Sequence, residues 1–480
     1  ELKLSLTMPQ IPLDFYLAAS PIMVLCLLSI VLILQCCVKS LAAPHQIFGT
    51  TIVGFLIALV LSLIFNTQTS YLGGTYLSGF LTQFGQCFIL VLALVTALLY
   101  RETFLNEKFY RGEIASLFAM IVAGMLVMIS TDDLITLFVG LELSSIGLYA
   151  VVGYINPTQR SQEGAIKYFV LGSFAAAILL MGLGLLYAGT GHMTISAILQ
   201  SLPEASSHPW VKLGVLMTVA GLGFKLALAP FHLWAPDAYE GAPTGMTGFM
   251  ATGVKAMIIL VCLRVFNNGF GYIAEVWMPA LMLLAMVSMI IGNIMALVQN
   301  SLKRMLAYSS IAHSGYMAIA ICTLGSEDLL PSTTIIFYLI SYSIVSLGAF
   351  GILMWLESKD NDNLTLDDIS GLAQKHPYAA FAMAVFMFSF AGMPPTSGFI
   401  GKFFVFNAAL QQQLYSLVII GVIGSTISLY YYLRVIVRMY MKEEPELVLK
   451  PHTPEKSITI STMVTATVAV AILLGTLLPG

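Results

Sequence analysis

Long apolar segments alternate along this chain with short polar connections. Fourteen such segments can be drawn, at residues 14–37, 46–65, 77–100, 112–130, 133–153, 163–188, 211–231, 243–264, 276–299, 302–323, 332–356, 377–408, 414–440 and 457–478. Most have about the 20 residues that a helix needs to cross a bilayer. Their apolar residues are continuous and do not alternate as in the strands of a membrane barrel. The pattern predicts an all-α polytopic membrane protein with about 14 transmembrane helices.

Composition supports a membrane protein and argues against several other classes. Of the 480 residues, 58% are hydrophobic and only 9% are charged, whereas about 25% of residues are charged in soluble domains. The net charge of −3 gives no reason to expect a nucleic acid partner. The six cysteines form no C-x-x-C pair, so neither a disulfide framework nor a metal framework is predicted. The connections are too short to form a domain for a nucleotide or a redox cofactor.

Basic residues gather in alternate connections between the predicted helices. The odd-numbered connections carry most of them, for example Lys39, Arg101, Arg160 and Lys303. The even-numbered connections carry almost none and contain acids such as Asp132. Because Lys and Arg favour the cytoplasmic side, the odd connections are predicted to face the cytoplasm. Both termini are then predicted to lie on the opposite, periplasmic side.

Two parts of the chain are predicted to be copies of one five-helix unit. The stretches "DLITLFVGLELSSIGLY" from Asp133 and "SLKRMLAYSSIAHSGYM" from Ser301 align at an offset of 301 − 133 = 168 residues. Pro230 and Pro394 interrupt the seventh and twelfth segments at a similar separation. A unit of five helices must be inverted in its second copy, and inverted repeats with broken helices are typical of transporters. We predict N-terminal helices 1–3 (1–110), a first repeat of helices 4–8 (111–266), a second repeat of helices 9–13 (275–442) and helix 14 (443–480).

Ionisable side chains lie deep inside several predicted helices. Lys225 follows Lys212 by 13 residues, which is about 20 Å along a helix and too far for its side chain to reach the nearer surface. Four more ionisable residues each lie nine residues from the polar residue at the nearer helix end: Glu142, Lys255, His313 and Lys402. Such groups are costly in a membrane and typically mark ion pathways.

The balance of these groups favours proton transfer. One deep acid accompanies three deep lysines, Lys225, Lys255 and Lys402. Because burial favours the neutral amine, some of these lysines are predicted to rest neutral and to accept a proton. Clustered oxygen ligands for Na⁺ are missing from the predicted helices.

The proline break supplies a second part of this hypothesis. Pro230 cannot donate a hydrogen bond to the Leu226 carbonyl, so water entering the break is expected to connect Lys225 to His232. The hypothesis is a hydrated row across the membrane midplane, formed by Glu142, Lys225, His232, Lys255 and Lys402.

Structural alternatives remain open for each of these residues. A buried lysine–glutamate pair can serve packing alone, and His313 can be a core histidine with satisfied hydrogen bonds. His232 can lie at the membrane interface. Lys167 is one turn inside its helix and can pair with Glu163 four residues earlier.

Several long motifs resemble one family of membrane proteins. The stretches "GFKLALAPFHLWAPDAYEGAPT", "EGAIKYFVLGS", "SLKRMLAYSSIAHSGY" and "AGMPPTSGFIGKFFVF" resemble the antiporter-like membrane subunits of proton-pumping NADH:quinone oxidoreductase, respiratory complex I, and most closely subunit N, which is subunit 2 in mitochondria. The resemblance implies a proton-translocating translocase subunit. It assigns proton transfer to the glutamate and lysines of helices five, six, seven, eight and twelve, namely Glu142, Lys167, Lys225, Lys255 and Lys402.

The resemblance also implies cofactors, partners and a location. It places NADH, FMN, iron–sulfur clusters and quinone in partner subunits and no cofactor in this one. The implied partners are subunit M, the small membrane subunits next to the quinone arm, lipid, protons and internal water. The implied location is the bacterial inner membrane, with an organellar inner membrane less favoured. Two alternatives share this fold: a subunit of a multisubunit cation/proton antiporter and a subunit of a membrane-bound hydrogenase.

Overall fold

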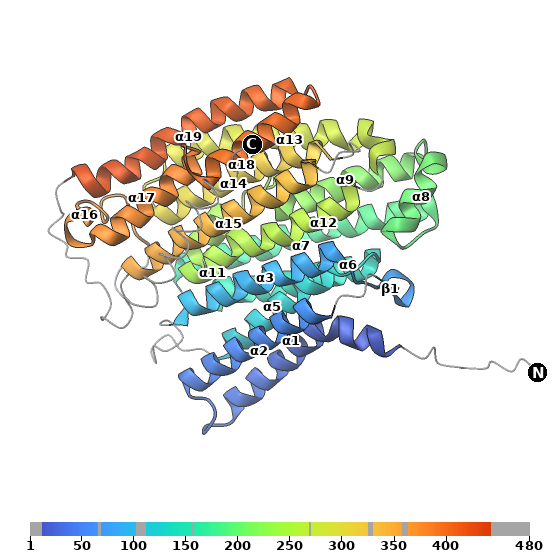
Figure 1. The fold of residues 1–480 in the computed structure, drawn as a ribbon, viewed down its shortest axis with the longest axis horizontal. Coiled ribbons are helices and arrows are strands. Elements are labelled where there is room, and N and C mark those ends of the chain that lie inside the picture. The colour runs from blue at the N-terminus through green and yellow to red at the C-terminus, as the bar shows by residue number, and fades with distance from the viewer. Residues whose placement is uncertain are drawn as a thin grey trace, which may run out of the picture.

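Long helices lie roughly side by side in one stack in the computed structural model (Figure 1). The structure describes residues 12–65, 69–101, 112–154, 158–267, 270–324, 330–357 and 363–442. The N-terminal helices form one flank of the stack and α19, the last described helix, forms the opposite flank. Within the described ranges, ten helices are long and apolar enough to cross a membrane. The prediction of an α-helical polytopic membrane protein is therefore confirmed.

The first half of the chain folds into helices and one very short β-ribbon. The helices are α1 (Leu13–Cys37), α2 (Pro44–Ile64), η1 (Leu72–Gly74), α3 (Phe80–Leu99), α5 (Glu113–Ile129), α6 (Leu134–Tyr154), α7 (Gln159–Thr190), α8 (Ile195–Ala205), α9 (Pro209–Lys225) and α10 (Ala235–Gly241). The antiparallel ribbon consists of β1 (Ser70–Tyr71) and β2 (Tyr76–Leu77), in which Ser70 lies opposite Leu77.

The second half contains helices only, in its described part. They are α11 (Thr244–Phe249), a π-helical turn η2 (Met250–Val254), α12 (Lys255–Asn267), η3 (Phe270–Ile273), α13 (Ala274–Leu297), α14 (Leu302–Cys322), α15 (Leu330–Leu356), α16 (Leu372–Lys375), α17 (Pro377–Ala391), α18 (Ser397–Gln411) and α19 (Tyr415–Met441). The segment predicted at 457–478 lies outside the described residues.

Two of the predicted membrane segments are broken at their prolines. The seventh ends as a helix at Lys225, and the residues from 226 to 234 form turns. The twelfth divides into α17 and α18, which are separated by residues 392–396. Proline lacks a backbone N–H and clashes with the preceding turn, which explains why both helices stop there. Each break brings backbone polar groups into the interior of the stack.

The helices that carry Lys255 and His313 are the most deeply buried of the ten described spans. The span formed by α11, η2 and α12 is 94% buried and α14 is 100% buried, against 33% for α1. In lipid, a helix that is apolar on all sides can face the bilayer, whereas α14 carries polar side chains that need protein partners. Lys255 on α12 and His313 on α14 therefore lie at the centre of the molecule.

Close helix contacts depend on glycine at two places near the site. A Cβ added to Gly140 on α6 would lie 2.7 Å from the Met128 backbone nitrogen on α5. A Cβ added to Gly214 on α9 would lie 2.9 Å from the Gly182 carbonyl oxygen on α7. Such small residues allow membrane helices to pack backbone to backbone. These contacts fix the positions of α6 and α9, which carry Glu142 and Lys225.

The same backbone contact occurs at both ends of the stack. At the end near α8, the Leu134 N–H donates to the Met193 carbonyl at 2.9 Å. At the end near α16, the Leu302 N–H donates to the Leu364 carbonyl, also at 2.9 Å. Figure 1 places α8 and α16 at opposite ends of the long axis of the helices. In each case the residue just before the helix forms an isolated β-bridge, Asp133 with Thr194 and Ser301 with Thr365.

Candidate functional site

Lys225, the last residue of α9, points at one face of α6. Its Nζ donates to the Ser145 hydroxyl at 2.6 Å and to the Tyr149 hydroxyl at 3.2 Å. Glu142 shares this face of α6, because it precedes these two residues by three and seven positions. Its Oε1 atom is buried and has no hydrogen-bond partner among the described residues. Glu142 and Lys225 therefore interact through their charges without a direct ion pair.

The break after Lys225 is filled by hydroxyl groups from two other helices. The Leu226 carbonyl, which Pro230 cannot bond, accepts a hydrogen bond from the Ser314 hydroxyl of α14 at 2.5 Å. The Ala229 N–H donates to the Ser288 hydroxyl of α13 at 2.7 Å. The freed backbone groups are thus satisfied inside the protein. A cavity of about 200 Å³ beside Pro230 is lined by apolar side chains, so the break itself opens no polar cavity there.

His232 lies in the same turn but away from the hydrogen bonds of Lys225. It is 7% exposed, and its Nδ1 atom is buried without a hydrogen-bond partner in the described structure. An unpartnered buried ring nitrogen is unusual, because buried polar atoms normally find partners. The structure places His232 beyond the break, as predicted, without a described contact that joins it to the lysines.

Lys255 is buried at the start of α12, directly after the π-helical turn η2. Its Nζ donates to the Ser310 carbonyl and to the Ser314 hydroxyl, the latter at 2.6 Å. The Tyr342 ring centroid lies 5.2 Å from the same atom. Single π-turns are frequent at functional sites, because they displace the backbone locally. Lys255 and the break in α9 therefore share one hydrogen-bond partner, Ser314.

His313 lies between Lys255 and Lys402 and interacts electrostatically with both. Its Nδ1 is 2.7 Å from the Tyr338 hydroxyl and its Nε2 is 3.3 Å from the Tyr432 hydroxyl. A cavity of about 10 Å³ next to the ring is lined in part by hydroxyl side chains, and this volume is close to the minimum for one water molecule. Both ring nitrogens of His313 thus have hydroxyl partners, as a core histidine would, and the ring also lies within electrostatic range of two lysines.

Lys402 reaches back from α18 to the end of α17. Its Nζ donates to the Phe390 carbonyl at 2.8 Å, to the Ala391 carbonyl at 3.2 Å and to the Ser425 hydroxyl at 3.0 Å. The last carbonyls of a helix have no partner within the helix and carry partial negative charge. The amine therefore caps α17 at the second helix break. The Tyr316 ring, 5.0 Å away, completes its surroundings on the side of His313.

Lys167 lies outside this row. Its side chain is 42% exposed and forms ion pairs with Glu163 at 2.5 Å and with Asp237 at 2.6 Å. Arg304 joins Asp237 at 2.6 Å and Glu240 at 2.8 Å, which extends the network from α7 through α10 to α14. Burial tends to raise the pKa of Asp237, but the hydrogen bonds from Lys167 and Arg304 outweigh it and lower the pKa below its ordinary value. The structure assigns Lys167 to an ion network that connects helices of both predicted repeats.

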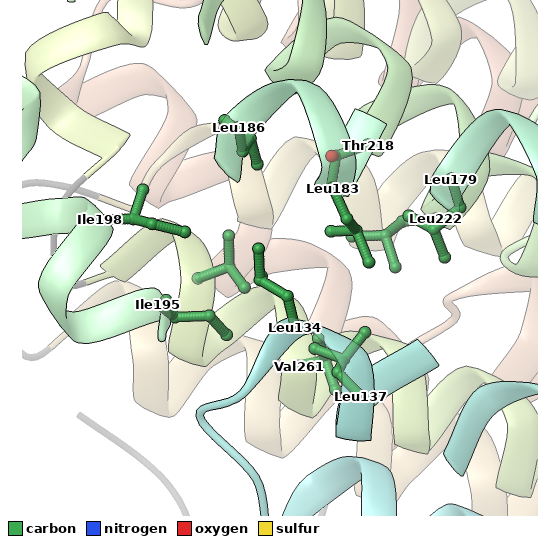
Figure 2. Close-up of a pocket in the computed structure, with 11 residues that line it drawn as sticks. Leu134, Leu137, Leu179, Leu183, Leu186, Ile195, Ile198, Thr218, Leu222 and Val261 are labelled. Atoms are coloured by element: carbon green, nitrogen blue, oxygen red, sulfur yellow. The ribbon is translucent and has the colours of Figure 1, made fainter. Parts of the chain in front are cut away.

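An apolar cavity lies on the α8 side of Lys225. Figure 2 shows leucine and isoleucine side chains from α6, α7, α8 and α9 pointing into it. Thr218 and Leu222, which precede Lys225 on α9, belong to its lining, and the Thr218 hydroxyl is already bonded to the Gly214 carbonyl. A cavity with such a lining stays dry.

Metal ligation is not supported by the described part of the chain. Its residues form no group of three or more His, Cys, Asp or Glu side chains that could hold a metal ion. The deep ionisable residues instead contact hydroxyl groups, carbonyl groups and aromatic rings. This arrangement suits the transfer of protons better than the binding of a cation.

Comparisons with known proteins agree with the motifs. A family model described as NADH:quinone oxidoreductase/Mrp antiporter, TM, matches residues 131–428. NADH-quinone oxidoreductase subunit N 1 of Sorangium cellulosum is 40% identical over 413 residues, which cover 81% of each chain. The chain belongs to the NADH-quinone oxidoreductase subunit N family. Subunit N of Bdellovibrio bacteriovorus is a further relative, 36% identical over 441 residues and 90% of each chain.

Solved structures share the fold of this subunit N family member. A chain of respiratory complex I from Thermus thermophilus with bound aureothin matches with a TM-score of 0.80 and 32% identity, over 95% of this chain and 97% of that chain. A chain of the Mrp complex from Dietzia sp. matches with a TM-score of 0.79 but only 19% identity, over 97% of this chain and 94% of that chain, which shows the fold alone.

The sequence did not reveal the neutral partners of the lysines. Ser145 and Tyr149 lie three and seven residues after Glu142, a spacing that places all three on one helix face. Ser314 follows Ser310 by four residues and also shares its face. This spacing of hydroxyl residues within apolar helices was the available signal. Which lysine each face meets depends on how the helices pack, and a subunit N sequence taken alone does not supply that.

Proposed function

We propose that the chain is a proton-translocating membrane subunit of NADH:quinone oxidoreductase. It moves protons along a row formed by Glu142, Lys225, Lys255, His313 and Lys402. The energy comes from quinone reduction in partner subunits, and the membrane subunit itself carries no redox centre. His232 is an additional member at the α9 break.

The observation that carries this proposal is the environment of the three central lysines. Lys225, Lys255 and Lys402 are 3%, 2% and 4% exposed. Their hydrogen-bond acceptors are hydroxyl and backbone carbonyl oxygens, and no described carboxylate oxygen lies within 4.0 Å of their amines. An amine held by neutral acceptors can lose and regain a proton without breaking an ion pair. Buried ionisable groups of this kind typically mark proton pathways.

Contacts between neighbouring groups define the order of the row. Glu142 interacts electrostatically with Lys225. Ser314 forms hydrogen bonds with both the Leu226 carbonyl next to Lys225 and the amine of Lys255. Tyr342 and His313 lie between Lys255 and Lys402. The gaps between these groups exceed one hydrogen bond, so water molecules complete the transfer steps. Lys167 acts outside the row, through its ion pair with Asp237.

The row lies within two inverted repeats in this proposal. The repeats comprise helices 4–8 (111–266) and 9–13 (275–442), with helices 1–3 (1–110) before them and helix 14 (443–480) after them. The shorter helices α5 and α9 and the broken pair α17–α18 add three spans to the ten long helices, and the fourteenth lies outside the described residues. The matching backbone contacts at opposite ends of the stack support the inversion, since Leu134 and Leu302 differ by 302 − 134 = 168 residues. Both termini then lie on the periplasmic side of a bacterial inner membrane.

Partner subunits supply what this chain does not carry. NADH, FMN, iron–sulfur clusters and quinone bind to other subunits, and the neighbours in the membrane are subunit M and the small subunits next to the quinone arm. Co-purification with peripheral iron–sulfur subunits is the expected result. Isolation in a small complex of membrane subunits alone would contradict this proposal and favour a cation/proton antiporter.

Lys225→Ala and Glu142→Ala test the function in the assembled complex. Both variants are expected to lower NADH-driven proton translocation into sealed membrane vesicles by about tenfold or more, because each removes a group that cannot be bypassed in a buried row. Lys212→Ala is the matched control, because Lys212 lies exposed at the start of the same helix. The proposal fails if assembled complexes with Lys225→Ala and Glu142→Ala translocate protons at the rate of the unmodified complex.

A further inference from the structure

One hydroxyl group connects the break in α9 to Lys255. The Ser314 Oγ atom accepts a hydrogen bond from Lys255 Nζ at 2.6 Å and donates to the Leu226 carbonyl at 2.5 Å. Ser314 has no exposed surface, and Leu226 is 1% exposed. This arrangement links two elements that are remote in the sequence, the residue after Lys225 and the first residue of α12.

The Leu226 carbonyl depends on this hydroxyl. In an unbroken helix it would accept from the backbone of residue 230, but Pro230 has no N–H. Ser314 is the described group that donates to it. The Ser314 hydrogen has one alternative acceptor within reach, the Ser310 carbonyl at 3.1 Å. The position of a single hydrogen atom therefore decides whether the broken end of α9 is satisfied.

The protonation state of Lys255 determines where that hydrogen can point. An ammonium group has three donors and no acceptor, so a charged Lys255 can only donate to Ser314. The Ser314 hydroxyl then keeps donating its hydrogen bond to the Leu226 carbonyl. A neutral amine has a lone pair, which the Ser314 hydroxyl can use as its acceptor.

We propose that Ser314 is a positioning residue that couples the protonation state of Lys255 to the broken end of α9 beside Lys225. This inference rests on the proposed proton-transfer function of the lysines. When Lys255 gives its proton to an adjacent water molecule, one Nζ–H bond breaks and one O–H bond forms on that water. The Ser314 hydroxyl then donates to the lone pair of Lys255 Nζ and no longer to the Leu226 carbonyl. Reprotonation reverses the exchange.

Through this coupling, the protonation state of Lys255 affects the backbone next to Lys225. While Lys255 is charged, the turn after Lys225 is held to α14. While Lys255 is neutral, the carbonyl next to Lys225 is released and can accept from water or from the Lys225 amine. The described groups that face Lys255 are Tyr342 from α15 and His313 from α14, and the Ser310 carbonyl accepts from its amine. None of these is a carboxylate, and the carbonyl cannot donate, so Ser314 is the hydrogen-bond partner that distinguishes the two states.

Ser314→Ala in the assembled complex tests the coupling, with Ser314→Thr as the conservative variant. Ser314→Ala is expected to lower proton translocation about tenfold, the factor expected for one buried hydrogen bond. It also removes one of the two acceptors of the charged amine, so the alkaline limb of the translocation–pH profile should move about one pH unit to lower pH. Ser314→Thr retains a hydroxyl and should restore both the rate and the profile.

Ser288→Ala is the matched control for a merely structural role. Ser288 also bonds the backbone of the break, at the Ala229 N–H, but no described contact joins it to a lysine. Ser288→Ala should leave the pH profile in place, even if the complex becomes less stable. The coupling is refuted if Ser314→Ala keeps the original profile or if Ser288→Ala shifts it equally.

Two further variants distinguish a failure of this inference from a failure of the proposed function. Lys255→Arg keeps a permanent charge without a lone pair, so adding Ser314→Ala to it should cause no further loss of the residual translocation rate. A further loss would refute the coupling through Lys255. Lys225→Ala measured in the same vesicles reports on the function: unchanged translocation there refutes the row itself, whereas loss there with a normal Ser314→Ala refutes the coupling alone.

Discussion

Lys402→Ala should destabilise the protein more than Lys255→Ala does, although both replacements remove the same atoms from a buried site. The two lysines are 4% and 2% exposed, so the loss of packing and the relief of burying an amine are similar. The two replacements differ in whether they leave a backbone carbonyl without a hydrogen-bond donor. Lys402 is the described donor to the Phe390 carbonyl at the end of α17, whereas the Ala391 carbonyl also accepts from Ser425.

The expected difference in the free energy of unfolding follows from one carbonyl that loses its hydrogen-bond donor. Removing Lys255 leaves the Ser314 hydroxyl in place to donate to the Leu226 carbonyl. Removing Lys402 leaves the Phe390 carbonyl without a described donor. A buried polar group without a partner costs about 1–3 kcal/mol. The free energy of unfolding should therefore fall by about 1–3 kcal/mol more for Lys402→Ala than for Lys255→Ala.

Thermal dissociation in detergent measures this difference. Complexes carrying either variant are heated in parallel, and the fraction of the subunit that remains in the intact complex is determined by size-exclusion chromatography. The midpoint temperature should be lower for Lys402→Ala. Equal midpoints, or a lower midpoint for Lys255→Ala, would show that the capping of α17 by Lys402 does not contribute to stability.

Three further predictions follow from the same contacts. His313→Phe keeps the ring volume but removes the bonds to Tyr338 and Tyr432, so proton translocation should fall several-fold while assembly, measured by native electrophoresis, is retained. Gly140→Ala forces a Cβ against the α5 backbone, 2.7 Å from the Met128 nitrogen, and overpacking of about 1–3 kcal/mol should lower the yield of assembled complex. Lys167→Ala should reduce translocation less than Lys225→Ala, and an equal loss would place Lys167 in the row.

The sequence predicted the helices well, because the signal for each one is local. Continuous apolar segments identified the long helices but not the short α8, α10 and α16, and Pro230 and Pro394 identified the two breaks. The end of α9 at Lys225 was less predictable, since residues 226–231 are as apolar as the helix before them. The deep position of Lys255 and His313 followed from their distance to the helix ends. These properties depend on spacing along one helix, and the sequence contains that information.

The contacts of the ionisable residues depend on packing between helices and were not predictable in the same way. The sequence did not show that Ser314 and Ser288 bond the backbone of the α9 break or that the cavity beside Pro230 has an apolar lining. The expectation that water connects Lys225 to His232 stays a prediction. The pairing of Lys167 with Glu163 was correct, but Asp237, 70 residues later, was not foreseen. His313 was left open as a core histidine. Its place between two lysines emerges only when α14, α15 and α18 are assembled.

The central claim is that buried lysines with neutral partners carry protons through this subunit. Lys255→Ala tests it most directly, because Lys255 lies in the most deeply buried part of the row. Assembled complexes in sealed liposomes are supplied with NADH and quinone, and the number of protons translocated per NADH oxidised is measured. The account predicts a lower ratio for Lys255→Ala than for the unmodified complex. An unchanged ratio in a fully assembled complex would contradict it.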